Sequence, residues 1–226
     1  MFDYYYLVLV VPTIILSLIA QIMVKSTFSK YSKVMCSRNI TGKEAAALLL
    51  RENGINDVAI EAAKGSLTDH YSPMDKKLRL SEPVYGVASI AAVGVAAHET
   101  GHAIQHARAY GPLGLRSSLV PVANIGSMIG PYAAMAGLAL SMPMLINIGI
   151  ILFGGAVLFY VITLPVEFNA SARALAILRD QNILGPTELA GVKKVLSAAA
   201  MTYVASALTA LMSLLRLILL SRGRRR

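Results

Sequence analysis

The chain of 226 residues is 56% hydrophobic, contains no Trp and carries a formal net charge of +9. Its mean hydropathy of +0.61 exceeds that of ordinary soluble domains and indicates a membrane protein. Because its basic residues cluster near the ends of apolar segments, where anionic lipid headgroups attract them, and no aromatic-basic pattern accompanies them, we expect no nucleic-acid binding.

Residues 4–24 are the first apolar segment, without charge and long enough to span a bilayer, which takes about 20 residues. Its basic residues follow the apolar core, which is not the pattern of a cleaved signal peptide. Asp3 is the only charged residue before the segment, whereas basic residues follow it. The positive-inside rule therefore predicts that the N-terminus lies outside and the following segment lies in the cytoplasm. The lone Cys36 excludes an internal disulfide and suits a reducing compartment. The basic residues that set this orientation are Lys25, Lys30, Lys33, Arg38 and Lys43.

Residues 25–118 form the expected water-soluble part. Thr41-Gly42-Lys43-Glu44 has the pattern of a capping box and opens an Ala- and Leu-rich helix that ends near Gly54. Residues 57–61 and 77–81 alternate polar and apolar side chains as short strands do. We expect the second strand to be the sheet edge along which an extended substrate lies, because an edge offers unpaired backbone groups.

His70 and Tyr71 lie between the two expected strands. Their donor groups could contact a substrate or the developing charge of a transition state. An equally good interpretation is a turn histidine and a packing tyrosine.

The most informative motif is His98-Glu99-Thr100-Gly101-His102, which follows the apolar residues 84–97. This run is too short to span and is interpreted as the buried first half of one helix. On that helix the two imidazoles lie one turn apart and can bind one Zn²⁺ ion, while Glu99 points toward a metal-bound water and can take its proton. The alternative is a surface helix with an incidental pair of histidines.

His106 continues the series but is not expected to be the third ligand. On a straight helix it lies about 12 Å along the axis from His98, too far for zinc–nitrogen bonds of about 2.0 Å. It is interpreted as a residue behind the ligands or at the surface.

The next two apolar segments cover residues 119–142 and 144–165, and Pro143 between them marks a tight hairpin. The hairpin returns the chain to its starting side, where Glu167 begins a helical pattern. Two histidines and one glutamate form a standard catalytic zinc site, so Glu167 is the preferred third ligand.

The motif at 98–102 together with Val166-Glu167-Phe168-Asn169-Ala170-Ser171 resembles the membrane-bound neutral zinc metallopeptidases, and more distantly the HtpX and CAAX prenyl endopeptidases. Leu67-Thr68-Asp69-His70-Tyr71 and Leu78-Arg79-Leu80-Ser81 resemble the same family, so the likeness spans most of the chain. It implies that Glu167 is the third ligand. In the distant relatives an Asp follows that glutamate by four positions, where this chain has Ser171.

Asn169 and Ser171 could contact the zinc ligands from behind, and local capping of a helix start is the equal alternative. Arg173 lies about 120° around an ideal helix from Glu167, on another face, so direct help to the metal is not expected.

Residues 198–220 are the fourth apolar segment, with Arg216 near its end, where a long side chain can reach the interface. If it spans, it places Arg222 and the following arginines outside, against the positive-inside rule. Either this segment bends back or lies in the interface, or the rule fails here.

Together these features predict a mainly α membrane protein, residues 1–226 as a single domain, with about four transmembrane helices. A small zincin-like α+β cytoplasmic part, residues 25–118 and 166–197, carries the metal helix. The expected function is zinc-dependent cleavage of membrane or membrane-proximal proteins at the cytoplasmic membrane, with the bilayer, protein substrates and membrane protein partners or a second copy of the chain as partners. The alternatives are a metal-ion transporter and a catalytically inactive membrane scaffold.

Overall fold

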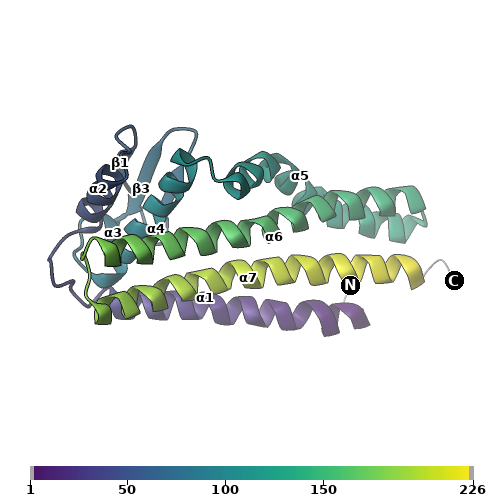
Figure 1. The fold of residues 1–226 in the computed structure, drawn as a ribbon. Coiled ribbons are helices and arrows are strands. Elements are labelled where there is room, and N and C mark those ends of the chain that lie inside the picture. The colour runs from purple at the N-terminus through teal and green to yellow at the C-terminus, as the bar shows by residue number, and fades with distance from the viewer. Residues whose placement is uncertain (1–2, 224–226) are drawn as a thin grey trace. The chain divides into compact units, whose positions relative to one another are not determined.

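The computed structural model describes residues 3–223 and divides into two compact units, which Figure 1 colours by residue number. The helical unit comprises Met1–Gln21, Gly114–Pro165 and Met201–Arg226. The mixed unit comprises Ile22–Leu113 and Val166–Ala200. Helices α1 (Val11–Tyr31), α6 (Pro143–Asp180) and α7 (Pro186–Gly223) contribute residues to both units, as does the first turn of α5 (Gly111–Leu140).

Close backbone packing joins the two helices of the predicted hairpin, α5 (Gly111–Leu140) and α6, within the helical unit (Figure 1). The connection turns at Ser141, which has a φ of 56°, and α6 begins at Pro143 as expected. A Cβ atom at Gly126 would collide with the carbonyl oxygen of Leu152, and one at Gly149 with the backbone nitrogen of Ala134. The glycines therefore allow helix-to-helix contact, as small residues do in lipid.

The ends of the first and last helices meet within the helical unit. The chain enters α1 through a π-helical turn, η1 (Tyr6–Val10), next to Pro12, which has no N–H to continue the α-helical pattern. Arg216 Nε donates a hydrogen bond of 2.9 Å to the Asp3 carboxylate. Helix α7 runs unbroken to Gly223, so the last apolar segment does not bend back within residues 198–220.

Within residues 3–223, four helices are long and apolar enough to cross a membrane, in agreement with the predicted number. Their bounds are Tyr6–Tyr31, Gly111–Leu140, Pro143–Asp180 and Pro186–Gly223. The last two have 38 residues each, or about 57 Å at 1.5 Å per residue, whereas the hydrocarbon core is about 30 Å thick. Each therefore extends well beyond the apolar segment that the sequence predicts.

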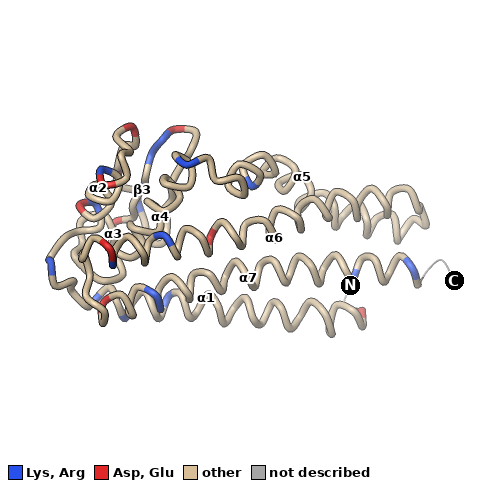
Figure 2. The backbone as a smooth tube through the Cα atoms, in the orientation of Figure 1, with Lys and Arg blue, Asp and Glu red and all other residues tan. Residues whose placement is uncertain are grey.

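Charge separates the two units. Figure 2 shows long stretches of α5, α6 and α7 without a charged residue, and the helical unit contains no His, no Glu and a single Asp, Asp3. Most charged side chains belong to the mixed unit. This distribution and the four apolar helices are those of a multi-pass membrane protein.

The mixed unit begins with the end of α1, followed by α2 (Gly42–Glu52). The predicted capping box is present: Glu44 N–H donates to the Thr41 hydroxyl, and the Glu44 carboxylate accepts from Thr41 N–H at 2.8 Å. Gly54, with a φ of 72°, follows the helix in the left-handed conformation that glycine accepts best. Local signals thus determine both ends of α2.

The sheet corrects two expectations. It contains three strands, β1 (Ala59–Ala63), β2 (His70–Ser72) and β3 (Lys77–Ser81), in the order β1-β3-β2. The expectation that 77–81 is an edge was wrong, because β3 pairs in parallel with β1 on one side and antiparallel with β2 on the other. His70 and Tyr71 belong to a strand that the sequence does not signal, and β2 forms one edge of the sheet.

Residues 84–97 are not one helix, contrary to expectation. A single turn, α3 (Glu82–Tyr85), precedes a break at Gly86, and α4 (Ile90–Ala107) begins after Ser89. The Ser89 hydroxyl accepts a hydrogen bond of 3.1 Å from Ala92 N–H and is buried, so it caps α4.

Helix α4 is the centre of the mixed unit. One of its sides packs with α2, α6 and α7 residues in a cluster that includes Val93, Leu178 and Val192. Another packs against β3 residues Leu78 and Leu80. Apolar burial on several sides holds α4 in place, and the metal motif lies on this helix.

Candidate metal centre

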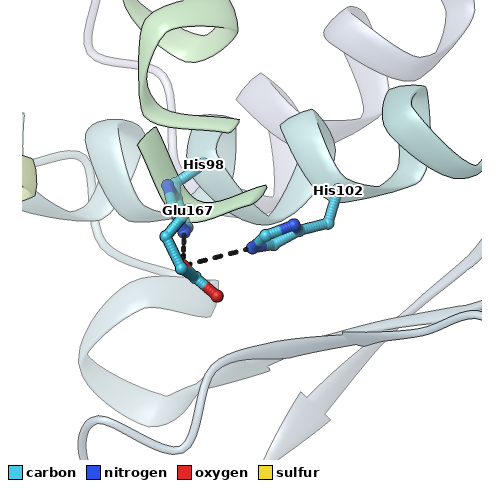
Figure 3. A group of neighbouring side chains, drawn as sticks. All are labelled: His98, His102 and Glu167. Carbon is cyan, nitrogen blue, oxygen red and sulfur yellow. Dashed lines mark hydrogen bonds and ion pairs between the residues drawn. The ribbon is translucent and has the colours of Figure 1, made fainter. Parts of the chain in front are cut away.

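His98 and His102 lie one turn apart on the same face of α4, as their spacing predicts (Figure 3). Their ring centroids are 4.8 Å apart, with the rings nearly perpendicular at 86°. His102 is buried and the His98 side chain is only 12% exposed. The two imidazoles are thus fixed by a buried helix.

Gly101 allows helix α6 to approach this face of α4. A Cβ at position 101 would lie 2.8 Å from the carbonyl oxygen of Ala170 and 3.2 Å from its Cα. Those atoms are backbone and cannot move without shifting α6. The glycine inside the motif therefore permits the helix crossing that brings Glu167, three residues before Ala170, to the histidines.

Glu167 completes a three-residue group with the histidines (Figure 3). Its Oε2 lies 3.2 Å from His98 Nε2 and 3.6 Å from His102 Nε2, and the possible ligand atoms of the group all lie within 4.8 Å of one another. Three ligands at about 2.0–2.1 Å from one tetrahedral Zn²⁺ would be roughly 3.3 Å apart. The donor set and its spacing fit zinc.

The electrostatic environment of the group favours a cation. Burial opposes the charged form of His102, but the carboxylates of Glu167 and Glu99 outweigh that cost and raise the pKa of this imidazole. A pocket that stabilises an extra proton beside two carboxylates also attracts a metal ion, with which protons compete for the histidine nitrogens.

Glu99 is 9% exposed and follows His98 on α4. Within residues 3–223 its carboxylate accepts no hydrogen bond. Every fully buried side-chain oxygen in that range has a hydrogen-bond partner, so the Glu99 oxygens are not fully buried. Its oxygens therefore keep some contact with solvent, and its charge acts on the neighbouring imidazole of His102. No side chain in that range occupies the carboxylate.

Ser171 lies behind His98, since its hydroxyl oxygen is 3.1 Å from His98 Nδ1. An imidazole that offers Nε2 to a metal carries its proton on Nδ1 and can donate it to this hydroxyl. Ser171 therefore contacts the outer nitrogen of one histidine of the group. Asn169 reaches the other histidine through one intervening side chain.

That intervening side chain is Gln105, which the sequence interpretation did not single out. Gln105 is fully buried, and its Oε1 lies 2.9 Å from His102 Nδ1. Its Nε2 donates to the Asn169 side chain at 3.0 Å. The available signal was a glutamine three residues after His102, on the same face of the helix as the histidines, where its amide can reach an imidazole.

His70, Tyr71 and His106 interact with residues outside the three-residue group. His70 Nδ1 lies 2.9 Å from the Thr68 carbonyl, and its Nε2 lies 3.3 Å from Arg79. The Tyr71 hydroxyl lies 2.8 Å from His106 Nδ1. His106 is thus turned to β2, in agreement with its exclusion as a ligand, and Tyr71 connects β2 to α4.

Asp69 connects residues 67–71 to residues 78–81, the two stretches before the metal motif that resemble the family. Its carboxylate accepts hydrogen bonds from Ser81 N–H at 2.7 Å and from the Ser81 hydroxyl at 2.8 Å. The loop before β2 is thereby fixed to the end of β3.

Comparison with known proteins agrees with this geometry. Residues 6–222 match the model of a family described as "Putative neutral zinc metallopeptidase". The chain is 49% identical over 215 residues to the "Putative membrane protease YugP" of Bacillus subtilis (strain 168), covering 95% of this chain and 96% of that protein. No solved structure matches the chain.

Proposed function

The chain belongs to the neutral zinc metallopeptidase family, and on that premise we propose that it is a zinc-dependent endopeptidase of membrane and membrane-proximal proteins. The observation that carries the proposal is the largely buried group of His98, His102 and Glu167, with Glu99 next to it on the same helix. In this proposal the first three residues are the metal ligands and Glu99 is the general base.

A bound zinc ion would polarise the substrate carbonyl and bring the pKa of a water at its open position to about 7. The chain's own part is positioning and proton transfer. The Glu99 carboxylate accepts the proton of the attacking water and then delivers it to the leaving amine. Ser171 and Gln105 lie at the Nδ1 atoms of His98 and His102, so these histidines would offer their Nε2 atoms to a bound ion.

We further assign the substrate to the β2 edge. β2 is the edge strand that connects to α4 through Tyr71 and His106, one turn after His102. An extended segment can pair with the free backbone groups of such a strand. Tyr71 and His70, which point to opposite faces of β2, would then flank the bound segment.

For orientation we propose that the mixed unit faces the cytoplasm in the cell membrane. The segment after the first span carries the basic residues, as the positive-inside rule requires. The α5–α6 hairpin crosses twice, which puts Glu167 on the same side as the histidines.

A metal transporter is a weaker candidate. A pathway through the bilayer needs several intramembrane polar ligands, whereas the helical unit has no His or Glu and its single Asp3 pairs with Arg216. An inactive scaffold would keep the metal group but cleave nothing, so it is separated from the enzyme by experiment.

The test is the substitution Glu99→Gln in the full-length purified protein. Because Glu99 is proposed as base and not as ligand, zinc content should stay at the parent level while cleavage of fluorescently labelled casein falls by about 10² or more. His98→Ala should lose both. Glu52→Gln, an exposed glutamate of the same unit, is the control and should change neither. A Glu99→Gln variant that cleaves as fast as the parent would disprove the mechanism.

A further inference from the structure

A chain of polar side chains leads away from His102 into the contact between α4 and α6. It consists of Gln105, Asn169 and Arg173, and we call it the relay. Gln105 Nε2 donates to the Asn169 Oδ1 atom at 3.0 Å, and Arg173 Nε donates to the same oxygen at 2.7 Å. The Arg173 guanidinium also lies over the Tyr110 ring, 5.9 Å from its centroid.

A main-chain carbonyl determines the orientation of the Gln105 amide. Gln105 Nε2 lies 2.8 Å from the carbonyl oxygen of Val166, which can only accept a hydrogen bond. The amide group must therefore present its nitrogen there and its Oε1 to His102. Because Oε1 can only accept, the proton of the His102 imidazole is on Nδ1 and the lone pair is on Nε2.

Arg173 determines the orientation of the Asn169 amide in the same way. A guanidinium has donors and no acceptor and stays charged at any ordinary pH. The Asn169 atom beside it must be the oxygen, and this oxygen also receives the second proton of the Gln105 amide. The relay is thus fixed at one end by a group that only accepts and at the other by a group that only donates.

The relay also spans the position of Glu167 on α6. Val166 is the residue before Glu167 and Asn169 is two residues after it, and Gln105 of α4 bonds to both. One buried amide therefore fixes the tautomer of His102 and ties α4 to α6 beside Glu167. Ideal helix angles suggest no role for Arg173, but its long side chain reaches Asn169, one turn earlier.

We infer that Gln105, Asn169 and Arg173 are positioning residues that hold His102 with Nε2 toward the metal and hold Glu167 in register with it. The inference rests on the proposed function, because it concerns the same centre. It assigns Arg173 a role at a distance, through Asn169 and Gln105, with no contact to the metal.

The experiment measures metal affinity and metal geometry as well as activity. Gln105→Met keeps the volume but removes all three hydrogen bonds, so Zn²⁺ affinity in competition with a chelator should fall by about 10- to 100-fold, the usual loss for such partners. Asn169→Leu and Arg173→Met should lower it too, and the visible absorption of the Co²⁺-loaded protein should change in all three. Arg179→Gln, an exposed arginine further along α6, is the matched control and should change nothing.

Conservative replacement separates positioning from general support of the fold. Asn169→Asp keeps an oxygen for both Gln105 and Arg173, so it should retain zinc affinity within about threefold and the parent Co²⁺ spectrum. In the Arg173→Met background the same Asp is a half-buried carboxylate without its cation and should not restore affinity.

Three results would overturn the inference. The first is unchanged metal affinity and Co²⁺ spectrum in Gln105→Met, Asn169→Leu and Arg173→Met, which would leave the proposed function standing if Glu99→Gln still separates binding from cleavage. The second is a loss of affinity in Asn169→Asp equal to that in Asn169→Leu, because Asp keeps the accepting oxygen and equal losses would mean that this oxygen does not position the ligands. The third is no metal binding by the unsubstituted protein, which would overturn the proposed function as well.

Discussion

At the scale of single residues, the centre is defined by what lies behind each ligand. His98 has a hydroxyl at its Nδ1 atom and His102 has an amide oxygen, so the two equivalent ligands have different supports. Charged partners of a metal-bound imidazole raise its basicity more than neutral ones. Ser171 is therefore the position at which affinity is most easily changed without altering a ligand.

Substitution of Ser171 gives a directional prediction. Ser171→Ala removes the acceptor for His98 Nδ1 and should weaken Zn²⁺ binding by about tenfold, the lower end of the range for such partners. Ser171→Asp, the residue found at this place in distant relatives, restores an acceptor and should bind zinc at least as tightly as the parent. Chelator competition measures both. Tighter binding by Ser171→Ala than by Ser171→Asp would contradict the role of this hydroxyl.

At the scale of helices and strands, the crossing of α4 and α6 decides whether a ligand set exists. The crossing depends on Gly101, whose missing side chain accommodates the Ala170 backbone. Overpacking a tight contact costs about 1–3 kcal/mol. At this contact an added side chain should also push α6 away from α4 and so displace Glu167 from the histidines.

Gly101→Ala should therefore lower both the unfolding temperature in detergent and the affinity for zinc. Gly154→Ala is the matched control, because an added Cβ at Gly154 meets nothing within 4 Å and alanine favours a helix by up to about 1 kcal/mol. The control should bind zinc like the parent. Parent-like affinity in Gly101→Ala would show that the helix crossing tolerates a side chain at position 101 and does not depend on glycine.

Features that depend on neighbouring residues could be predicted from the sequence at this scale, whereas the pairing of distant segments could not. The capping box of α2 and the face shared by His98 and His102 follow from residues within one turn of each other. The order β1-β3-β2 does not, because strand order depends on contacts between distant residues, and β2 has only three residues in which to show alternation. Ser89, a good cap within an apolar run, was the missed sign that α4 begins at Ile90.

The site shows the same division. The motif at 98–102 could be recognised from residue type and spacing, whereas Glu167 was singled out by the returning hairpin and by the family resemblance. The contact of Gln105 with Asn169 could not be recognised, because it exists only where α4 crosses α6.

At the scale of the whole molecule, a metal centre built from His98, His102 and Glu167 requires both parts of the mixed unit to lie on one side of the membrane. Single cysteines at Lys64 and Ala190, both exposed, test this in a Cys36→Ala background. Impermeant maleimide added to intact cells should label neither, and should label both after the membrane is opened. Strong labelling of either thiol in intact cells would contradict the cytoplasmic orientation.

If His98, His102 and Glu167 bind one zinc ion, X-ray absorption at the zinc edge of the purified protein should detect it. We expect one zinc per chain, with nitrogen and oxygen ligands at about 2.0–2.2 Å and a scattering pattern of two imidazoles. The His98→Ala variant should lose the metal or show a single imidazole. A sulfur ligand at about 2.3 Å, or the same spectrum in the parent and in His98→Ala, would show that these three residues do not form the zinc site.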